Sequence, residues 1–246
     1  MKSTPSRKEK VGAAMTFRLQ PEQAVENGLK QIVRRQLKSA LHEMDDFGDH
    51  CDDKVHNVRK CCKKARAVLR LLRDGLAKRV FHKENVRLRD GARPLAAVRD
   101  AKVLAQALDT LLNADRTSFR AFGSVRRFLE KNKQSVVRSA LQDRVAVAEL
   151  RHSLKMARSR PHRLQVSGDI WVVVHRGLVR VYDAGHRALA AAAADRAVRK
   201  LHEWRKQAKY LRYQLEILLP LWPERVKELA CQSVELKRRF GHSLRA

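Results

Sequence analysis

The stretch at 55–73, VHNVRKCCKKARAVLRLLR, decides the fold of this chain together with its second occurrence at 201–219, LHEWRKQAKYLRYQLEILL. The two stretches align without a gap, and the offset that pairs His56 with His202 also pairs Arg59 with Arg205. Self-similarity in which basic residues stay in register indicates a repeated structural unit. We therefore expect two copies of one helical element.

Basic and apolar residues separate on a helix that turns by about 100° per residue. Apolar residues such as Val58 and Leu69 occupy one side of the first copy, and Trp204 and Leu215 occupy that side of the second. The opposite sides carry what we call the first basic stripe (His56, Arg59, Lys63, Arg66, Arg70 and Arg73) and the second basic stripe (His202, Arg205, Lys209 and Arg212).

The first basic stripe lacks acidic residues until Asp74. Like charges three and four positions apart on a helix repel each other, and a solvated helix face usually interleaves acids with bases. The stripe therefore predicts an anionic ligand. The alternative is a solvated basic surface that keeps the protein in solution.

Composition limits the class of ligand. The chain has 246 residues, with 54 Lys and Arg against 26 Asp and Glu, which gives a formal net charge of +28. Such a charge attracts nucleic acid, acidic membrane or a phosphate polymer. Aromatic residues make up only 5% of the chain, which is few for a protein that stacks bases. Non-specific nucleic-acid binding at low salt stays open as the second candidate.

Catalytic and metal-binding motifs are missing from the sequence. It contains no Walker loop, nucleophile elbow or HExxH, and the acidic cluster at 45–53 falls in a connector. We expect no catalytic residue, no metal and no cofactor; a domain that works beside a phosphohydrolase is the less favoured alternative. The chain also lacks an apolar run of 18 residues, so we expect no membrane insertion and a cytoplasmic location.

Helical periodicity runs through the whole chain and predicts an all-α protein. In the third helix the inward residues are expected to include Leu95, either Val98 or Ala96, and Val103, Leu104 and Leu111. The four-residue ladder of Arg34 and Lys38 adds basic residues to the first helix. Asp169 is a plausible cap of the helix at 170–194. The predicted helices lie at about 21–44, 54–80, 85–112, 117–158, 170–194, 197–219 and 224–239.

The repeated stretches resemble the signature helices of the CHAD domain, the conserved histidine α-helical domain. The first copy matches its His-x-x-Arg pattern at His56, Arg59, Lys63, Lys64 and Arg66, and the second at His202, Arg205, Lys206, Lys209, Arg212 and Tyr213. The segment at 89–104 resembles the third helix of that family, with its Arg–Asp pair at Arg99 and Asp100, and 177–190 resembles the first helix of its second half.

This resemblance implies two pseudo-symmetric antiparallel helical bundles built from four-helix repeats around a basic central groove. The polar, basic composition of 1–16 predicts a flexible tail, and Pro161 and Gly168 predict a linker at 159–169. The resemblance covers a CHAD domain at 17–246, with the first repeat at about 20–158 and the second repeat at about 170–246. The repeat register pairs Asp100 with Ala246, so the second repeat is expected to be incomplete. Completion by another copy, giving a homo-oligomer, is one expectation.

The resemblance further implies non-catalytic binding of inorganic polyphosphate, including association with polyphosphate granules. Arg would supply forked contacts and Lys mobile point charges. His56 and His202 are either phosphate contacts or structural residues, and Tyr213 bonds either phosphate or a neighbouring helix. Glu216 replaces Arg70 in the second copy and is expected to pair with an arginine, so the first copy is predicted to be the stronger half. The predicted binding residues are the two basic stripes with Lys60, Lys206, Tyr213, Arg34, Lys38, Arg89, Arg93, Arg99, Arg180 and Arg187.

Overall fold

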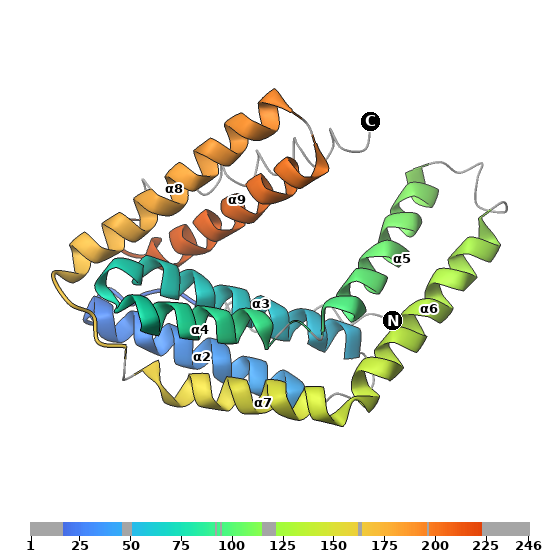
Figure 1. Cartoon of the computed structure of the whole chain (residues 1–246), viewed down its shortest axis with the longest axis horizontal. Helices are drawn as coiled ribbons and strands as arrows, with labels where there is room; N and C mark the ends of the chain where they lie inside the picture. Colours follow the sequence, from blue (N-terminus) through green and yellow to red (C-terminus); the bar gives the residue numbers. More distant parts are fainter. Residues whose placement is uncertain are drawn as a thin grey trace. The chain divides into compact units, whose positions relative to one another are not determined.

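The structure, a computed structural model, describes residues 17–45, 51–91, 93, 95–114, 122–161, 164–195 and 197–222. These residues form helices joined by short connections, and none of them belongs to a strand (Figure 1). The predicted all-α class is confirmed for this part of the chain. Even the β-branched run at 171–174 lies in a helix.

The described helices are α2 (Val25–Asp45), α3 (Cys51–Leu71), α4 (Lys78–Asp90), α5 (Ala96–Ala114), α6 (Gly123–Gln142), α7 (Arg144–Ser159), α8 (Ile170–Ala194) and α9 (Val198–Leu218), with a 3-10 turn η1 (Arg73–Gly75) after α3. Asp169 caps α8 as predicted, since its Oδ1 accepts a hydrogen bond of 2.9 Å from the backbone N–H of Val172. The predicted tail at 1–16 and the predicted helix at 224–239 lie outside the described residues.

Burial in α3 and α9 follows the repeat register. The two helices are buried at matching positions, because an apolar residue of each faces a core at the same point of the helix. The matched buried pairs are Val55 and Leu201, Val58 and Trp204, Leu69 and Leu215, Leu71 and Ile217, and Leu72 and Leu218. The two stretches therefore form equivalent helices, as their sequences predicted.

Two compact units divide the described residues. Unit 1 takes those within Met1–Gln36, Lys64–Asn85 and Arg160–Ala246, and unit 2 takes those within Leu37–Lys63 and Val86–Ser159. The division passes through α2, α3 and α4, so each of these helices contributes one part to each unit. The units therefore interleave along the chain.

Unit 1 is built around α8 and α9, which pack side by side (Figure 1). Gly177 lets α8 approach the end of α3 closely, because a Cβ atom there would lie 2.2 Å from the backbone oxygen of Leu71. The segment before α2 closes the core: Phe17 is fully buried edge-on against Tyr213, and the N–H of Leu19 donates to the carbonyl of Ile217 at 3.0 Å.

Unit 2 contains α5, α6 and α7 with parts of α2, α3 and α4. Helices α5 and α6 pack against each other as an antiparallel pair (Figure 1). Arg151 of α7 joins the end of α2 by an ion pair with Asp45 and by a 2.9 Å hydrogen bond to the carbonyl of Met44. Asn57 of α3 donates to Glu43 of α2 at 3.0 Å.

Three predicted helix boundaries are wrong. The helix expected at 117–158 is two helices, because Asp143 ends α6 and its Oδ1 accepts a 2.9 Å hydrogen bond from the N–H of Ala146 in the first turn of α7. The stripe helix ends at Leu71, since the chain turns through η1, where Gly75 packs closely on Val166 and Val173. The helix expected at 85–112 is interrupted after Asp90, in the Gly91–Pro94 segment of the sequence, which suits a break between helices.

The apolar side of α5 is also placed differently from the prediction. Leu95 and Val98 are buried as expected, but Val103, Leu104 and Leu111 are exposed. The reason is that α5 is apolar on two sides and packs against its neighbours with one of them. Residues such as Ala101 and Leu112 occupy the packed side.

Candidate polyanion-binding site

Basic side chains of α3 and α5 gather in unit 2. We call this group the α3–α5 basic cluster: His56, Arg59, Lys60, Lys63, Arg99 and Lys102. The four residues from α3 lie on one helix face, because all of them except the adjacent Arg59 and Lys60 are spaced by three, four or seven positions. The cluster joins the predicted first basic stripe to Arg99, which was predicted separately.

Electrostatics in the cluster disfavour additional positive charge. Burial lowers the pKa of His56 below its usual value, and the charges of Lys60, Lys102, Lys63 and Arg99 lower that pKa further. Burial also lowers the pKa of Arg59, with Arg99 adding to the effect. A group of cations that depresses the pKa of its own members is a place where an anion would bind favourably.

Two members of the cluster form ion pairs with acidic residues. Arg99 forms a 2.9 Å ion pair with Asp100, which confirms the predicted Arg–Asp pair, and Lys102 pairs with Asp53. Lys102 is the cluster member that sequence reasoning missed. Its spacing of three from Arg99 was the available signal, since that spacing places two residues on the same side of a helix.

The end of the first basic stripe belongs to unit 1, where its arginines are engaged by neighbouring groups. Arg66 donates to the side chain of Asn85 at 3.0 Å, and Arg70 donates to the backbone carbonyl of Arg66 at 3.3 Å. The guanidinium of Arg70 lies 4.0 Å from the ring centre of Tyr210, and burial lowers its pKa to about 10. These two arginines therefore contribute to the packing of unit 1.

Arg73 and Arg180 lie around η1 in unit 1. Arg73 is not in the stripe helix as predicted but in the 3-10 turn, with its guanidinium 5.2 Å from the ring centre of Phe81. Arg180 of α8 forms an ion pair with Asp74 of the same turn. Asp74, the first acidic residue after the first basic stripe, is therefore the ion-pair partner of Arg180, which was predicted to bind phosphate.

The second basic stripe has acidic neighbours on α9. Arg212 lies 3.9 Å from Glu216, which confirms the predicted arginine partner, and Glu216 also lies 3.5 Å from the buried Lys64. Lys206, beside the stripe, pairs with Glu203. His202 and Arg205 are exposed, and Lys209 is half-buried.

Tyr213 is a core residue of unit 1. Only 4% of it is exposed, and its ring is packed between Phe17 and the guanidinium of Arg212, which lies 4.8 Å away. This placement favours contact with neighbouring segments of the protein, the second of the two roles left open by the sequence.

The remaining predicted residues are dispersed over several elements. Arg89 forms a 2.7 Å ion pair with the adjacent Asp90 at the end of α4. Arg34 and Lys38 are exposed on α2, Arg187 is exposed on α8, and Arg93 is exposed between α4 and α5. The predicted residues that the structure brings together are those of the α3–α5 basic cluster.

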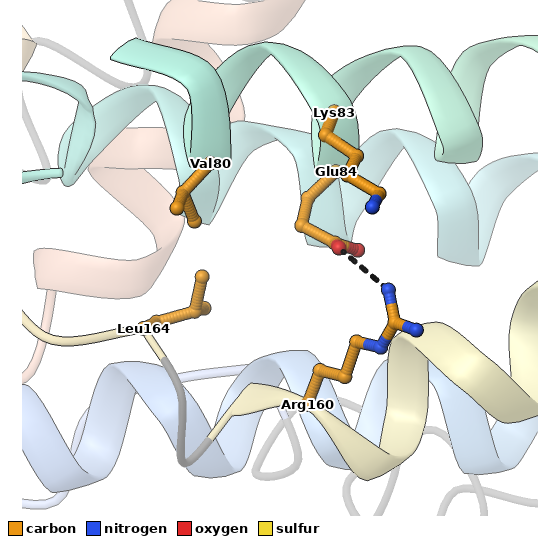
Figure 2. Close-up of a pocket in the computed structure, with 5 residues that line it drawn as sticks. All are labelled: Val80, Lys83, Glu84, Arg160 and Leu164. Atoms are coloured by element: carbon orange, nitrogen blue, oxygen red, sulfur yellow. Dashed lines mark ion pairs between the residues drawn. The ribbon is translucent and has the colours of Figure 1, made fainter. Parts of the chain in front are cut away.

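A small cavity of about 230 Å³ lies in unit 1. It is lined by Val80, Lys83, Glu84, Arg160 and Leu164 (Figure 2). Glu84 and Arg160 point toward each other and form an ion pair of 3.7 Å. A carboxylate in the wall repels phosphate, so this cavity is a poor anion site.

The described residues contain neither a group of metal ligands nor a membrane-spanning helix. Among the described residues, no three His, Cys, Asp or Glu side chains are grouped as metal ligands would be. No helix in this part of the chain is long and apolar enough to cross a bilayer.

Comparisons with known proteins agree with the repeated His-x-x-Arg helices. The family model of the CHAD domain matches residues 31–243. No curated protein and no solved structure matches the chain. Because the match includes both signature helices and most of the sequence, this chain belongs to the CHAD-domain family.

Proposed function

We propose that this protein binds inorganic polyphosphate without breaking it, and that the α3–α5 basic cluster is its principal contact. The observation that carries this proposal is the convergence of six basic side chains from two helices of one unit. Burial lowers the pKa of His56, and the charges of its basic neighbours lower that pKa further. Membership of the CHAD family, which is associated with polyphosphate binding, supports the same ligand.

The physical fit lies in the repeating charge of the ligand. A polyphosphate chain presents an anionic oxygen on every phosphate, so one chain can contact several cations of the cluster at once. Arg59 and Arg99 would donate forked hydrogen bonds to phosphate oxygens, and Lys60, Lys63 and Lys102 would act as mobile point charges. Binding would thereby relieve the repulsion that the free protein carries.

The second basic stripe and the arginines of unit 1 have a secondary part in this proposal. Several of them already have partners, as Arg212 has in Glu216 and Arg180 has in Asp74. Phosphate would have to compete with those partners. In the cluster, phosphate would likewise compete with Asp100 for Arg99 and with Asp53 for Lys102. The proposal ranks unit 2 above unit 1 because six basic side chains converge there.

A competition experiment tests the proposed ligand. Long-chain polyphosphate and duplex DNA are compared at equal phosphate concentration in about 150 mM NaCl, where surface charge is partly screened. We expect polyphosphate to displace DNA. Displacement of polyphosphate by DNA would favour the nucleic-acid alternative and overturn the proposal.

A pair of variants tests the proposed site. Arg59→Ala/Lys63→Ala removes two charges from the cluster, and Lys78→Ala/Arg138→Ala removes two exposed charges outside it. We expect the first variant to bind polyphosphate about tenfold or more weakly, because each lost charge-assisted contact is worth roughly 1.5–3 kcal/mol. Equal weakening by the control variant would show that only total charge matters.

The proposal also covers the absence of catalysis and the location of the protein in the cell. We propose that the protein releases no phosphate from polyphosphate with Mg²⁺ and that it resides in the cytoplasm with polyphosphate granules. A phosphate-release assay and microscopy of a fluorescent fusion test these two statements. Turnover that disappears in Arg59→Ala/Lys63→Ala would instead assign a hydrolase.

A further inference from the structure

The α5–α6 pair exposes apolar side chains that the proposed polyphosphate binding does not use. Leu111 of α5 and Phe128 of α6 are 60% and 68% exposed, and Leu104 and Val125 are exposed near them in the sequence. Large apolar side chains exposed together mark an interaction surface, whereas single ones are ordinary. These four side chains form one surface only if they lie on the same face of the α5–α6 pair.

An ion pair between the two helices fixes their faces. Asp109 of α5 and Arg126 of α6 are joined at 2.8 Å, so both point to the same face of the pair. Leu111 follows Asp109 by two positions, and Phe128 follows Arg126 by two. Two residues turn a helix by about 200°, so both apolar side chains point to the opposite face.

Helical spacing places Leu104 and Val125 on the same face as Leu111 and Phe128. Leu104 precedes Leu111 by seven positions and Val125 precedes Phe128 by three, spacings that keep each pair on one side of its helix. We call the surface formed by Leu104, Leu111, Val125 and Phe128 the apolar face of the α5–α6 pair.

Basic residues border the apolar face. Arg127 precedes Phe128 by one position and Lys131 follows it by three, and both are exposed. Helix α6 as a whole carries Arg126, Arg127, Lys131, Lys133 and Arg138 against a single acid, Glu130. Leucine and phenylalanine beside lysine and arginine form the pattern by which helices lie in a membrane interface.

We propose that the apolar face of the α5–α6 pair docks on anionic lipid bilayers, with its leucines and Phe128 at the headgroup boundary and its basic border on the lipid phosphates. Nucleic acid fits less well, because Leu104 and Leu111 have no flat ring on which bases could stack. A second copy fits less well, because a protein of net charge +28 repels itself. The lipid bilayer supplies both the apolar and the anionic complement.

Vesicle flotation with the full chain tests this proposal. Vesicles of phosphatidylcholine alone are compared with vesicles that contain one third phosphatidylglycerol, in about 150 mM NaCl to screen weak attraction. We expect binding to the anionic vesicles. Leu111→Ser/Phe128→Ser should weaken it about tenfold or more, because the apolar contribution to interfacial binding is lost.

Matched variants separate this surface from general charge. Val179→Ser/Val198→Ser replaces two exposed apolar residues of α8 and α9 and should leave vesicle binding unchanged. Arg127→Glu/Lys131→Glu should weaken binding to the anionic vesicles only. Vesicle binding that is unaffected by Leu111→Ser/Phe128→Ser would overturn the proposal, since the cations alone would then account for it.

Two further measurements keep the outcome distinct from polyphosphate binding. Leu111→Ser/Phe128→Ser should retain the wild-type affinity for polyphosphate; a parallel loss would show that it acts through the fold and would overturn the proposal. Light scattering should give the wild type and this variant the same molar mass. A dimer of the wild type only would assign the apolar face to a second copy instead.

Discussion

His56 lies among basic residues from two helices, Lys60 and Lys63 of α3 and Arg99 and Lys102 of α5, and these charges together with burial lower its pKa. As pH falls below about 6.5, the unfolded chain takes up a proton that the folded chain resists, so this residue reduces stability toward acid. A bound polyanion acts in the opposite direction, because it stabilises the imidazolium.

A pH dependence of binding follows from this residue. We expect the affinity for polyphosphate to rise as pH is lowered from about 8 to 6, by up to about tenfold for each unit by which the ligand raises the His56 pKa. Titration calorimetry in buffers of different ionisation enthalpy measures the accompanying proton uptake. His56→Gln should flatten the profile, and His82→Gln, at an exposed position on α4, should leave it unchanged. An identical profile for His56→Gln would assign the residue a structural role only.

Gln214 is the polar residue that fits its position least well. It is fully buried in α9 at the position equivalent to Val68, and neither Nε2 nor Oε1 has a hydrogen-bond partner among the described residues. We expect Gln214→Met to raise the free energy of unfolding by about 1–2 kcal/mol, since an unpaired buried amide is replaced by a side chain of similar shape. Urea denaturation measures this change. Gln207→Met is the control and should not stabilise, because Gln207 donates to Glu203 at 2.6 Å. A destabilised Gln214→Met would show that this amide is satisfied in solution.

The helices show which parts of the fold the sequence predicts. Basic and apolar periodicity located α3 and α9, and the Asp169 cap located the start of α8, because these signals are local. The break at Asp143 was missed because an acid within a basic helix is common and only its hydrogen bond to Ala146 identifies it as a cap. The exposed side of α5 was missed because two apolar sides of a helix cannot be ranked without knowing what packs against them.

The candidate site divides in the same way. Spacing predicted which α3 residues share a face, and the structure adds Lys102 from α5 to them. It also shows that Arg70 and Arg212 are packed against tyrosine rings. Sequence alone could not show this, since those partners depend on how the helices pack.

The close approach of α8 to the end of α3 at Gly177 can be tested by substitution. Gly177→Ala should lower the free energy of unfolding by about 1–3 kcal/mol, because its Cβ would overlap the backbone of Leu71, which cannot move as a side chain does. Gly185 of the same helix is the control, since a Cβ there would lie 3.7 Å from the Cβ of Gln207, an ordinary contact. Gly185→Ala should be stabilising by roughly 0.5–1 kcal/mol, as alanine favours helix. Equal effects of the two substitutions in urea denaturation would contradict the close approach.

Net charge controls the behaviour of the whole molecule. A charge of +28 makes the folded protein repel itself, and salt screens this repulsion. We expect the melting temperature to rise from about 20 to 300 mM NaCl while the affinity for polyphosphate falls over the same range. Differential scanning fluorimetry and binding titrations measure the two trends. A melting temperature that falls with salt would show that ion pairs such as Arg180–Asp74 outweigh the net repulsion.

The pairing of Leu19 with Ile217 has a consequence for biosynthesis. These residues are nearly 200 positions apart, yet they share a backbone hydrogen bond, and Phe17 packs on Tyr213 beside them. Contacts between distant parts of a chain form late, because a long loop must close first. We therefore expect residues 17–19 to remain unpacked in the nascent chain, with Phe17 exposed, until α9 has been translated.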